Sequence, residues 1–192
     1  MTIHEKSRPL VAQIKHKKIL LVIDVQENLL KPQSKIHIDP GAVAPFLASL
    51  NKSIKAFAEQ GLPVIYTINE WTNPILNWLT GNVCKKGANG TGIDKKVSLL
   101  NNNIFHKSSN NALKNKDLTD FLKDGSITEI YLAGLFAEFC IKSTVKAAIH
   151  NHYRVMVIGD AVGSKNEKLK SRSIDYFKKK GATMVSIDQL HD

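Results

Sequence analysis

Cysteine is scarce in this sequence of 192 residues, which contains only Cys84 and Cys140. Two cysteines can form one disulfide at most, so the chain is not a small domain held together by a disulfide framework. Long apolar runs are also missing, because no segment approaches the roughly 20 residues that a helix needs to cross a bilayer. The N-terminus carries charges with no apolar segment behind them, which is not the pattern of a secretory signal. These absences predict a cytoplasmic protein with reduced thiols and no membrane partner.

Acidic residues are few as well, because 17 Asp and Glu stand against 27 Lys and Arg and give a formal net charge of +10. An excess of basic residues is typical of proteins that bind nucleic-acid phosphates. However, the sequence has no basic segment interleaved with aromatic residues and no Cys/His spacing of a zinc site. We therefore interpret the charge as a solvated, lysine-rich surface and expect no nucleic-acid partner.

Apolar residues, in contrast, make up an ordinary 43% of the chain. Residues 1–17 are polar and basic and predict an N-terminal arm, while residues 18–192 predict one domain. Apolar runs typical of strands occupy residues 18–25, 62–68, 103–107, 127–133, 153–159 and 182–187. Helical patterns occupy residues 40–60, a short stretch around 118–122, 138–151 and 167–180. This alternation predicts an α/β fold: one three-layer domain with a mostly parallel, Rossmann-like six-stranded sheet and helices on both faces.

One irregular segment, residues 69–103, interrupts this alternation. It contains Trp71, Trp78, Cys84 and a cluster of glycines at residues 87–92. The glycines do not form a phosphate-binding loop, because no Gly-Lys-Ser/Thr follows them and they do not join a strand to a helix. Long ordered loops in compact domains are often functional, which makes this excursion a candidate for function. Cys84 has no flanking base, and we interpret it as a structural or incidental thiol.

Three chemically capable side chains follow predicted strands, at the edge where open parallel sheets bind ligands. Asp24 ends the first strand, Lys107 ends the third, and Cys140 follows the fourth through a short turn into the next helix. A helix N-terminus and a nearby lysine both favour a thiolate, and N–H groups in the first turn can hold an oxyanion. Taken singly, each residue has an ordinary interpretation as a buried inert thiol, a turn cap or a surface lysine. Taken together, they predict a cysteine nucleophile with Asp24 as its base.

Four motifs in a fixed order give the chain a specific resemblance. They are LLVIDVQENL at residues 20–29, NIFHKSSNNAL at 103–113, YLAGLFAEFCIKSTVKAA at 131–148 and VIGDAV at 157–162. Over residues 18–187 the sequence resembles the isochorismatase-like cysteine hydrolases, which include nicotinamidases and N-carbamoylsarcosine amidohydrolases. Proteins of this family are commonly dimers or tetramers, so the resemblance also implies a homo-oligomer.

The resemblance implies a role for each candidate residue. Cys140 attacks a carbonyl carbon, Asp24 deprotonates it and later activates water, and Lys107 stabilises the thiolate and positions Asp24. A cis peptide bond between Leu135 and Phe136 aims the Phe136 N–H, together with that of Cys140, at the oxyanion. The implied reaction forms an acyl-enzyme from an amide, releases ammonia or an amine, and ends with hydrolysis.

The chain departs from the resemblance at the metal ligands. Where nicotinamidases carry Asp-Trp-His-Pro, this chain has Asn-Glu-Trp-Thr-Asn-Pro at residues 69–74. Thr72 replaces the first histidine, and Val83 replaces a later one. A zinc or iron site needs its nitrogen ligands, and Glu70 alone cannot supply them, so we predict no metal and no other cofactor. The turn before the nucleophile also differs, with Ala-Glu at residues 137–138 where the family usually has Thr-Asp.

The sequence therefore predicts a metal-independent cysteine hydrolase that cleaves a C–N bond of a small amide or ureide. Isochorismatase proper lacks the cysteine, so Cys140 favours covalent amide chemistry over vinyl-ether hydrolysis. The aromatic residues Trp71, Phe136 and Phe139 are the candidate walls of the substrate pocket. Two alternatives stay open: a catalytically silent member that acts as a binding or scaffold protein, and a nicotinamidase-like enzyme with an altered metal site.

Overall fold

The computed structural model describes residues 18–190, and the predicted arm at residues 1–17 lies outside them. The strands are β1 (Lys18–Ile23), β2 (Val64–Asn69), β3 (Ile104–Lys107), β4 (Glu129–Gly134), β5 (Arg154–Val162) and β6 (Thr183–Val185). The helices are α1 (Glu27–Leu30), α2 (Val43–Glu59), α3 (Pro74–Thr80), α4 (Lys116–Asp124), α5 (Lys142–His150) and α6 (Glu167–Lys180). Short 3₁₀ turns lie at Pro40–Ala42, Ala112–Lys114 and Ile187–Leu190, and a π-helical turn lies at Ala137–Ile141.

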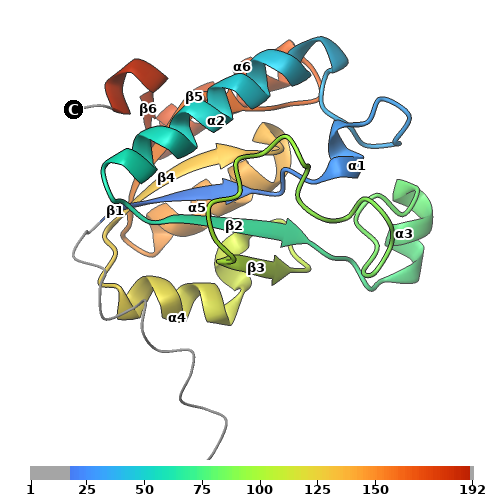
Figure 1. The fold of residues 1–192 in the computed structure, drawn as a ribbon, viewed down its shortest axis with the longest axis horizontal. Coiled ribbons are helices and arrows are strands. Elements are labelled where there is room, and N and C mark those ends of the chain that lie inside the picture. Colours follow the sequence, from blue (N-terminus) through green and yellow to red (C-terminus); the bar gives the residue numbers. More distant parts are fainter. Residues whose placement is uncertain (1–17, 191–192) are drawn as a thin grey trace, which may run out of the picture.

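The six strands form one sheet in the order β3-β2-β1-β4-β5-β6, and all neighbouring pairs are parallel (Figure 1). The predicted α/β fold is therefore confirmed. The chain builds outward from β1 to β3 on one side and then crosses to β4 on the other side of β1. The carboxyl ends of β1 and β4 thus flank the point where the strand order reverses, which is where open α/β sheets bind ligands.

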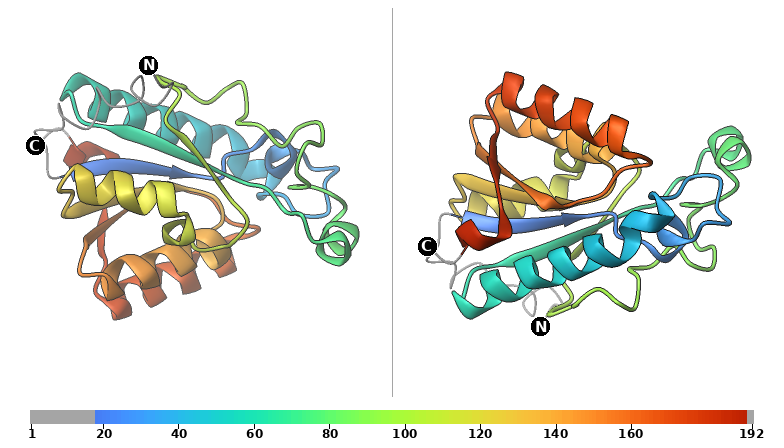
Figure 2. Two further views of the ribbon diagram at one scale, coloured as in Figure 1. Left: turned by 90° about the horizontal axis from the view of Figure 1, so that it is seen from below. Right: turned by 90° about the horizontal axis from the view of Figure 1, so that it is seen from above.

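Strand β1 shows why this order is stable. Ile19, Leu21 and Ile23 pack in the core on one face of the sheet, and Leu20 and Val22 pack in the core on the other. Side chains of a strand alternate between its two faces, so a strand buried on both faces must be apolar throughout. Helix α2 covers one face, and α4, α5 and α6 cover the other (Figure 2).

Two helical segments differ from the prediction. The helix predicted over residues 138–151 is a π-helical turn, Ala137–Ile141, that continues into α5. The excursion holds a helix that was not predicted, α3, whose signals are nevertheless present in the sequence. The Asn73 side chain accepts a hydrogen bond from the Leu76 N–H at 3.0 Å, and Pro74 occupies the first helical position. Both are ordinary N-terminal signals of a helix.

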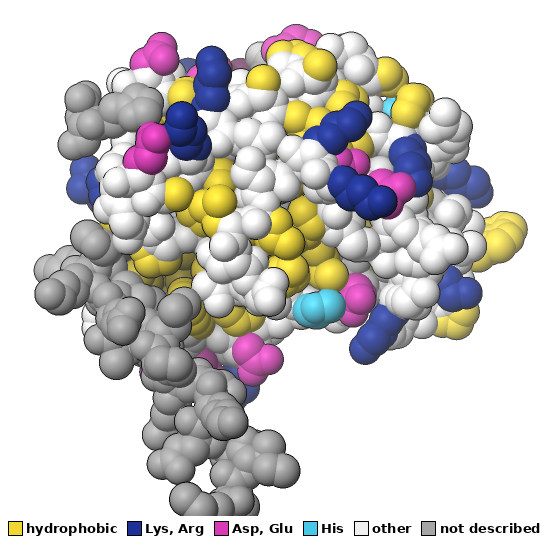
Figure 3. Space-filling model, in the orientation of Figure 1, with side chains coloured by type: hydrophobic (Ala, Val, Ile, Leu, Met, Phe, Trp, Pro, Cys, Tyr) yellow, Lys and Arg dark blue, Asp and Glu magenta, His cyan; other side chains and the backbone are white. Residues whose placement is uncertain are grey.

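Figure 3 shows no continuous basic stripe on the face that it draws. Lysines and arginines are dispersed there, and acidic side chains lie among them. Within residues 18–190, none of the helices combines the length and the apolar character needed to span a membrane.

Candidate active site

Asp24 lies directly after the central strand β1 and is 1% exposed. Its N–H donates to the Thr67 carbonyl at 3.0 Å, and its Oδ1 accepts a hydrogen bond from the Thr67 hydroxyl at 2.9 Å. Both contacts come from the neighbouring strand β2, so the sheet itself orients the carboxylate. A charge at this depth is strongly unfavourable unless a partner compensates for it.

Lys107, the last residue of β3, is that partner. Its Nζ donates to Asp24 Oδ2 at 2.6 Å and to the Ser109 carbonyl at 2.9 Å, and it lies 3.6 Å from Cys140 Sγ. The lysine reaches across β2 to the carboxyl end of β1 because strand β3 pairs with β2 so that Lys107 stands opposite Asn69. Its three N–H groups therefore have an anion, a carbonyl and the sulfur as partners.

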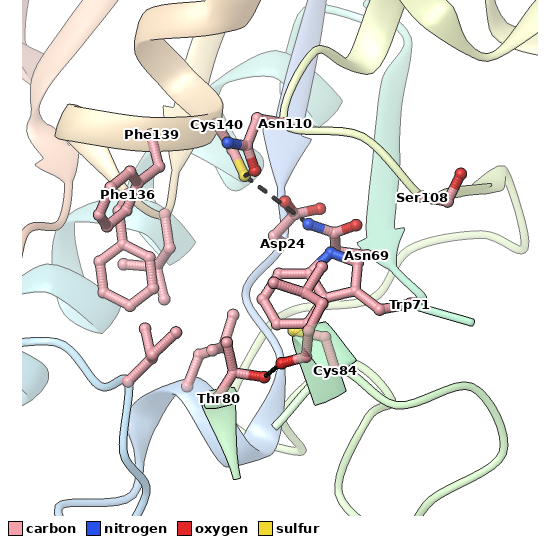
Figure 4. A pocket seen from close by; sticks show the side chains of 14 residues that line it. Asp24, Asn69, Trp71, Thr80, Cys84, Ser108, Asn110, Phe136, Phe139 and Cys140 are labelled. Carbon is pink, nitrogen blue, oxygen red and sulfur yellow. Dashed lines mark hydrogen bonds between the residues drawn. The ribbon is translucent and has the colours of Figure 1, made fainter. Parts of the chain in front are cut away.

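Cys140 lies in the π-helical turn that connects β4 to α5 and is 5% exposed. Besides Lys107, its Sγ contacts Asn110 Oδ1 at 3.7 Å and Asn69 Nδ2 at 3.9 Å (Figure 4). The structure thus brings Asp24, Lys107 and Cys140 from three separate segments to one place. The two asparagines were not singled out from the sequence; Asn69 ends β2, where the strand-end criterion applied to Asp24 and Lys107 would have found it.

The turn that carries Cys140 is tied to both neighbouring strands. The Leu135 N–H donates to the Ile23 carbonyl and the Ala137 N–H to the Gly163 carbonyl, each at 2.8 Å. The peptide bond between Leu135 and Phe136 is cis, at the position that the sequence resemblance names. For the Phe136 N–H, no acceptor is found among residues 18–190, so this donor is available to a ligand.

Gly134 allows the turn to approach β1 closely. Its φ of +116° is one that side chains with a Cβ rarely adopt, and an added Cβ would lie 2.1 Å from the Ile23 carbonyl oxygen. Only glycine fits this backbone conformation next to another main chain. The close approach places the end of β4, and with it the turn to Cys140, beside the end of β1.

The electrostatics of Cys140 differ from the sequence-based expectation. Burial raises the pKa of its thiol well above the ordinary value, and the negative charge of Asp24 raises this pKa further, while Lys107 opposes both effects. Burial and the charge of Asp24 therefore oppose the expected preference for a thiolate. The local field of a helix N-terminus and a lysine is outweighed by the removal of the sulfur from water.

Lys107 shows the complementary effect. Burial lowers the pKa of its ammonium group, but the negative charge of Asp24 and the nearby Cys140 outweigh burial, so the pKa is raised overall. The surroundings thus favour the charged form of Lys107 and the protonated form of the Cys140 thiol.

A cavity of about 350 Å³ opens in front of these groups. The residues predicted from the sequence as the walls and the turn, Trp71, Leu135, Phe136 and Phe139, all line it together with Asp24 and Cys140 (Figure 4). Lys107 lies behind Asp24 and does not line the cavity. A volume of this size lies at the lower end of the range for small-molecule sites.

Cys84, interpreted from the sequence as a structural or incidental thiol, also lines this cavity. Its Sγ lies 3.9 Å from Gln26 Oε1, and Gln26 in turn bonds the main chain of Asn69 and Thr91. Burial and the charge of Asp24 raise the pKa of the Cys84 thiol to about 12. Cys84 therefore contributes to the pocket wall as a neutral group.

The residues at the expected metal position do not fit a metal ion. Glu70 pairs with His106, with 3.1 Å between Oε2 and Nδ1, while Val83 is 3% exposed and packs in the core. Among the residues that the structure describes, no three His, Cys, Asp or Glu side chains are grouped so that they could share an ion. The donor set required for zinc or iron is thus not assembled here.

Comparison with known proteins places the chain in a family. A sequence model described as the isochorismatase domain matches residues 18–189. An isochorismatase family protein of Bacillus subtilis is 25% identical over 157 residues, which cover 81% of this chain and 82% of that protein. A ureidoacrylate amidohydrolase of Methylobacterium radiotolerans is 21% identical over 74% of this chain and 65% of its own length. Among solved structures, the N-carbamoylsarcosine amidase of Thermoplasma acidophilum has the same fold, with a TM-score of 0.77, 24% identity, and coverage of 90% of this chain and 98% of that one. Because the family model spans nearly the whole described structure, the chain belongs to the isochorismatase family.

Proposed function

We propose that this chain is a cysteine hydrolase that cleaves the C–N bond of a small amide or ureide without a metal ion. The observation that carries the proposal is the meeting of three segments at one cavity. Asp24 after β1, Lys107 at the end of β3 and Cys140 after β4 are buried, and Lys107 Nζ contacts both Asp24 Oδ2 and Cys140 Sγ. A nucleophile beside a base that is itself held by a third group is the general arrangement of covalent catalysis.

In the proposed reaction, Asp24 accepts the proton of the Cys140 thiol as Sγ forms a bond to the substrate's carbonyl carbon. The carbonyl oxygen becomes an oxyanion, which accepts a hydrogen bond from the Phe136 N–H. Asp24 then gives its proton to the substrate nitrogen as the C–N bond breaks, and ammonia or an amine leaves. Lys107 remains charged throughout and compensates for the negative charge as it moves between Sγ and the carboxylate.

The second half of the reaction regenerates the thiol. Asp24 takes a proton from a water molecule, whose oxygen attacks the carbonyl carbon of the thioester on Cys140. The C–S bond breaks, the carboxylic or carbamic acid leaves, and Sγ regains the proton from Asp24.

Two relatives support the class of bond. One is a ureidoacrylate amidohydrolase and the other a N-carbamoylsarcosine amidase, and both names denote hydrolysis at a C–N bond. Metal independence rests on this chain's own residues, since Thr72 and Val83 supply no nitrogen ligand. We expect dialysis against a chelator to leave activity unchanged, and a loss restored by zinc or iron would contradict this part of the proposal.

The test is ammonia release from a panel of primary amides and ureides. We expect turnover by the natural chain and by Cys84→Ala, and none by Cys140→Ala. Iodoacetamide followed by peptide mass spectrometry gives a second readout, in which Cys140 should be alkylated faster than Cys84 because only Cys140 contacts the Asp24–Lys107 pair. Equal or reversed alkylation would contradict an activated Cys140.

One observation favours a second candidate, a family member that binds its ligand without turnover. Cys140 is only 5% exposed, and this burial raises the pKa of its thiol, which disfavours the reactive thiolate. This candidate predicts that no amide or ureide in the panel is hydrolysed and that Cys140→Ala binds ligands as the natural chain does.

We also infer that the chain forms a homo-oligomer, a dimer or a tetramer. Helix α3 stands at one end of the molecule (Figure 2) and exposes 69% of Ile75, 74% of Trp78 and 58% of Leu79. Clustered apolar side chains are typical of interaction surfaces. Light scattering after size exclusion tests the inference, because Trp78→Glu should reduce the molar mass to that of the 21.3 kDa monomer.

A further inference from the structure

The lining of the cavity restricts the charge and polarity of the substrate, which the reaction class alone does not. We propose that it selects uncharged amides or ureides whose non-reacting part is apolar, and that it rejects substrates bearing a carboxylate. This inference rests on the proposed function, because it concerns the same cavity and the same nucleophile.

Much of the cavity lining is apolar. Leu29 and Ile36, from the segment after β1, and Leu76 of α3 line it. Phe136 and Phe139 line it as well (Figure 4). The two aromatic rings pack edge to face, with their centroids 6.3 Å apart. Apolar walls stabilise apolar groups by removing them from water, so this part of the cavity suits a hydrocarbon substituent.

No lining residue supplies a cation for a substrate carboxylate. Of the cavity-lining residues in the described chain, Asp24 is the only acid, and none is a lysine, arginine or histidine. The nearby Lys107 has its three N–H groups directed to Asp24, Ser109 and Cys140. Lys165 lies over the ring of Phe139, with Nζ 5.0 Å from the ring centroid, and does not itself line the cavity.

A carboxylate in this cavity would therefore lose its water without gaining a counter-ion. Burial of an unpaired charge is strongly unfavourable, and the ammonium group of Lys107 is already paired with Asp24. The two polar side chains that contact Cys140 Sγ, Asn69 and Asn110, are neutral, and so are the other polar lining residues, Ser108 and Thr80. Neutral amides and hydroxyls match the donors and acceptors of a carboxamide or ureido group.

This selectivity would separate the chain from the two relatives with named substrates. Ureidoacrylate and N-carbamoylsarcosine both carry a carboxylate in addition to the C–N bond that is hydrolysed. Family membership and reaction type therefore do not determine whether a substrate is charged. We infer the charge of the substrate from the lining of the cavity.

The first experiment compares isosteric substrate pairs, in which an isopropyl group replaces a carboxylate. The pairs are 5-methylhexanamide with glutaramate, and 3-methylbutylurea with 3-ureidopropionate. We expect kcat/KM to be at least about 100-fold higher for a neutral member. Equal turnover of the two members, or faster turnover of the carboxylate, would overturn the selectivity while leaving the hydrolase function intact.

The second experiment needs no turnover. Iodoacetamide is neutral and iodoacetate is an anion, and both alkylate thiols. We define the corrected ratio as the ratio of their alkylation rates at Cys140 divided by the same ratio for 2-mercaptoethanol, which removes the difference in intrinsic reactivity. We expect the corrected ratio at Cys140 to favour iodoacetamide by at least about tenfold. If this preference holds while no substrate is hydrolysed, the proposed function fails and the selectivity stands; a corrected ratio near one overturns the selectivity.

A charge introduced into the wall provides a matched control. Leu76→Arg places a cation in the cavity and should shift the corrected ratio toward iodoacetate by at least about tenfold. Thr72→Arg adds the same charge two residues before the same helix, at an exposed position that does not line the cavity, so its ratio should stay at that of the natural chain. Thr80→Arg, at another lining position of α3, keeps the test valid if Leu76→Arg does not fold. If the corrected ratio shifts equally in the control and in the lining variants, the effect comes from a long-range electrostatic field and not from the lining of the cavity. That result would overturn the proposal.

Discussion

Lys107 Nζ lies 2.6 Å from Asp24 Oδ2, and each side chain is 1% exposed. The two residues are 83 positions apart in the sequence and end strands that are separated by β2. An ion pair at this depth contributes little net stability, because the loss of water around both charges offsets their attraction. Its consequence is geometric, since it fixes a carboxylate and an ammonium group beside the sulfur of Cys140.

The ion pair leads to a prediction about stability. Lys107→Met leaves the Asp24 carboxylate buried without a partner, and Asp24→Leu leaves the ammonium group alone, so each should reduce the free energy of unfolding by about 3–5 kcal/mol. The double variant removes both charges and should be more stable than either single variant. Urea denaturation measures all four proteins. If the double variant loses as much free energy of unfolding as the two single variants together, the two charges do not stabilise one another and the prediction is wrong.

A second prediction concerns Gly134, whose missing side chain lets the turn approach β1. Gly134→Ala would place a Cβ 2.1 Å from the Ile23 carbonyl oxygen at a φ of +116°. We expect a loss of about 3 kcal/mol or more in the free energy of unfolding, because neither backbone can move without disturbing the sheet.

Gly159→Ala is the matched control for this change. In the neighbouring strand β5, a Cβ on Gly159 would meet only the end of the Met184 side chain, at 3.5 Å, so the loss should be less than about 1 kcal/mol. Thermal unfolding of both variants provides the comparison. Similar losses at the two positions would mean that the close approach of Gly134 is not important.

Alkaline pH provides a third prediction, through the thiol of Cys84. Burial, reinforced by the charge of Asp24 and opposed by Lys107, raises the pKa of this thiol from 9.0 to about 12. The folded protein therefore keeps a proton that the unfolded chain releases above pH 9.0. The stability that this thiol contributes is complete below that pH and is lost as the pH rises toward 12.

Between about pH 8 and about pH 10.5, Cys84 should reduce the free energy of unfolding by about 2 kcal/mol. This value follows from 1.36 kcal/mol for each pH unit above the pKa of the thiol in the unfolded chain. Cys140 acts in the same direction, because its pKa is also raised. Urea denaturation at the two pH values should show a smaller decrease for Cys84→Ala than for the natural chain. An identical decrease would place the alkaline sensitivity in other groups.

The framework of the site could be predicted from local patterns. The apolar run of β1 gives a strand buried on both faces, and such strands end at the edge where sites form. Asp24 and Lys107 were found because each polar side chain interrupts or ends such a run. Their pairing across β2 follows from the strand order, which the alternation of strands and helices restricts to a few possibilities.

The part of the cavity lining that comes from Leu29, Ile36, Leu76 and Thr80 could not be predicted in this way. Trp71 pairs with Lys85, and Gln26 pairs with Ile93, through isolated bridges that join the excursion to itself and to the end of β1. Such contacts depend on the three-dimensional path of a loop and leave no periodic pattern in the sequence. The same limit applies to the thiol of Cys140, because its burial is set by segments that pack over it and not by its own helix.

The last prediction concerns Glu138, which stands next to Phe139 and Cys140 in the π-helical turn. Its carboxylate accepts hydrogen bonds from the Ser164 hydroxyl at 2.8 Å and from the Lys165 N–H at 3.2 Å. Glu138 therefore ties the turn that carries the nucleophile to the segment after β5. Charge-assisted hydrogen bonds of this kind are stronger than neutral ones.

Glu138→Ala removes both bonds and should reduce the free energy of unfolding by about 1–3 kcal/mol. It should also slow the alkylation of Cys140 by iodoacetamide, because the turn is no longer held against Ser164. Ser164→Ala removes one bond and should have a smaller effect on both measurements. Glu167→Ala is the control, since Glu167 is an exposed acid in the first turn of α6 and its loss should change stability by less than about 1 kcal/mol. If Glu138→Ala reduces stability but leaves the alkylation rate of Cys140 unchanged, the carboxylate supports the fold without positioning the nucleophile.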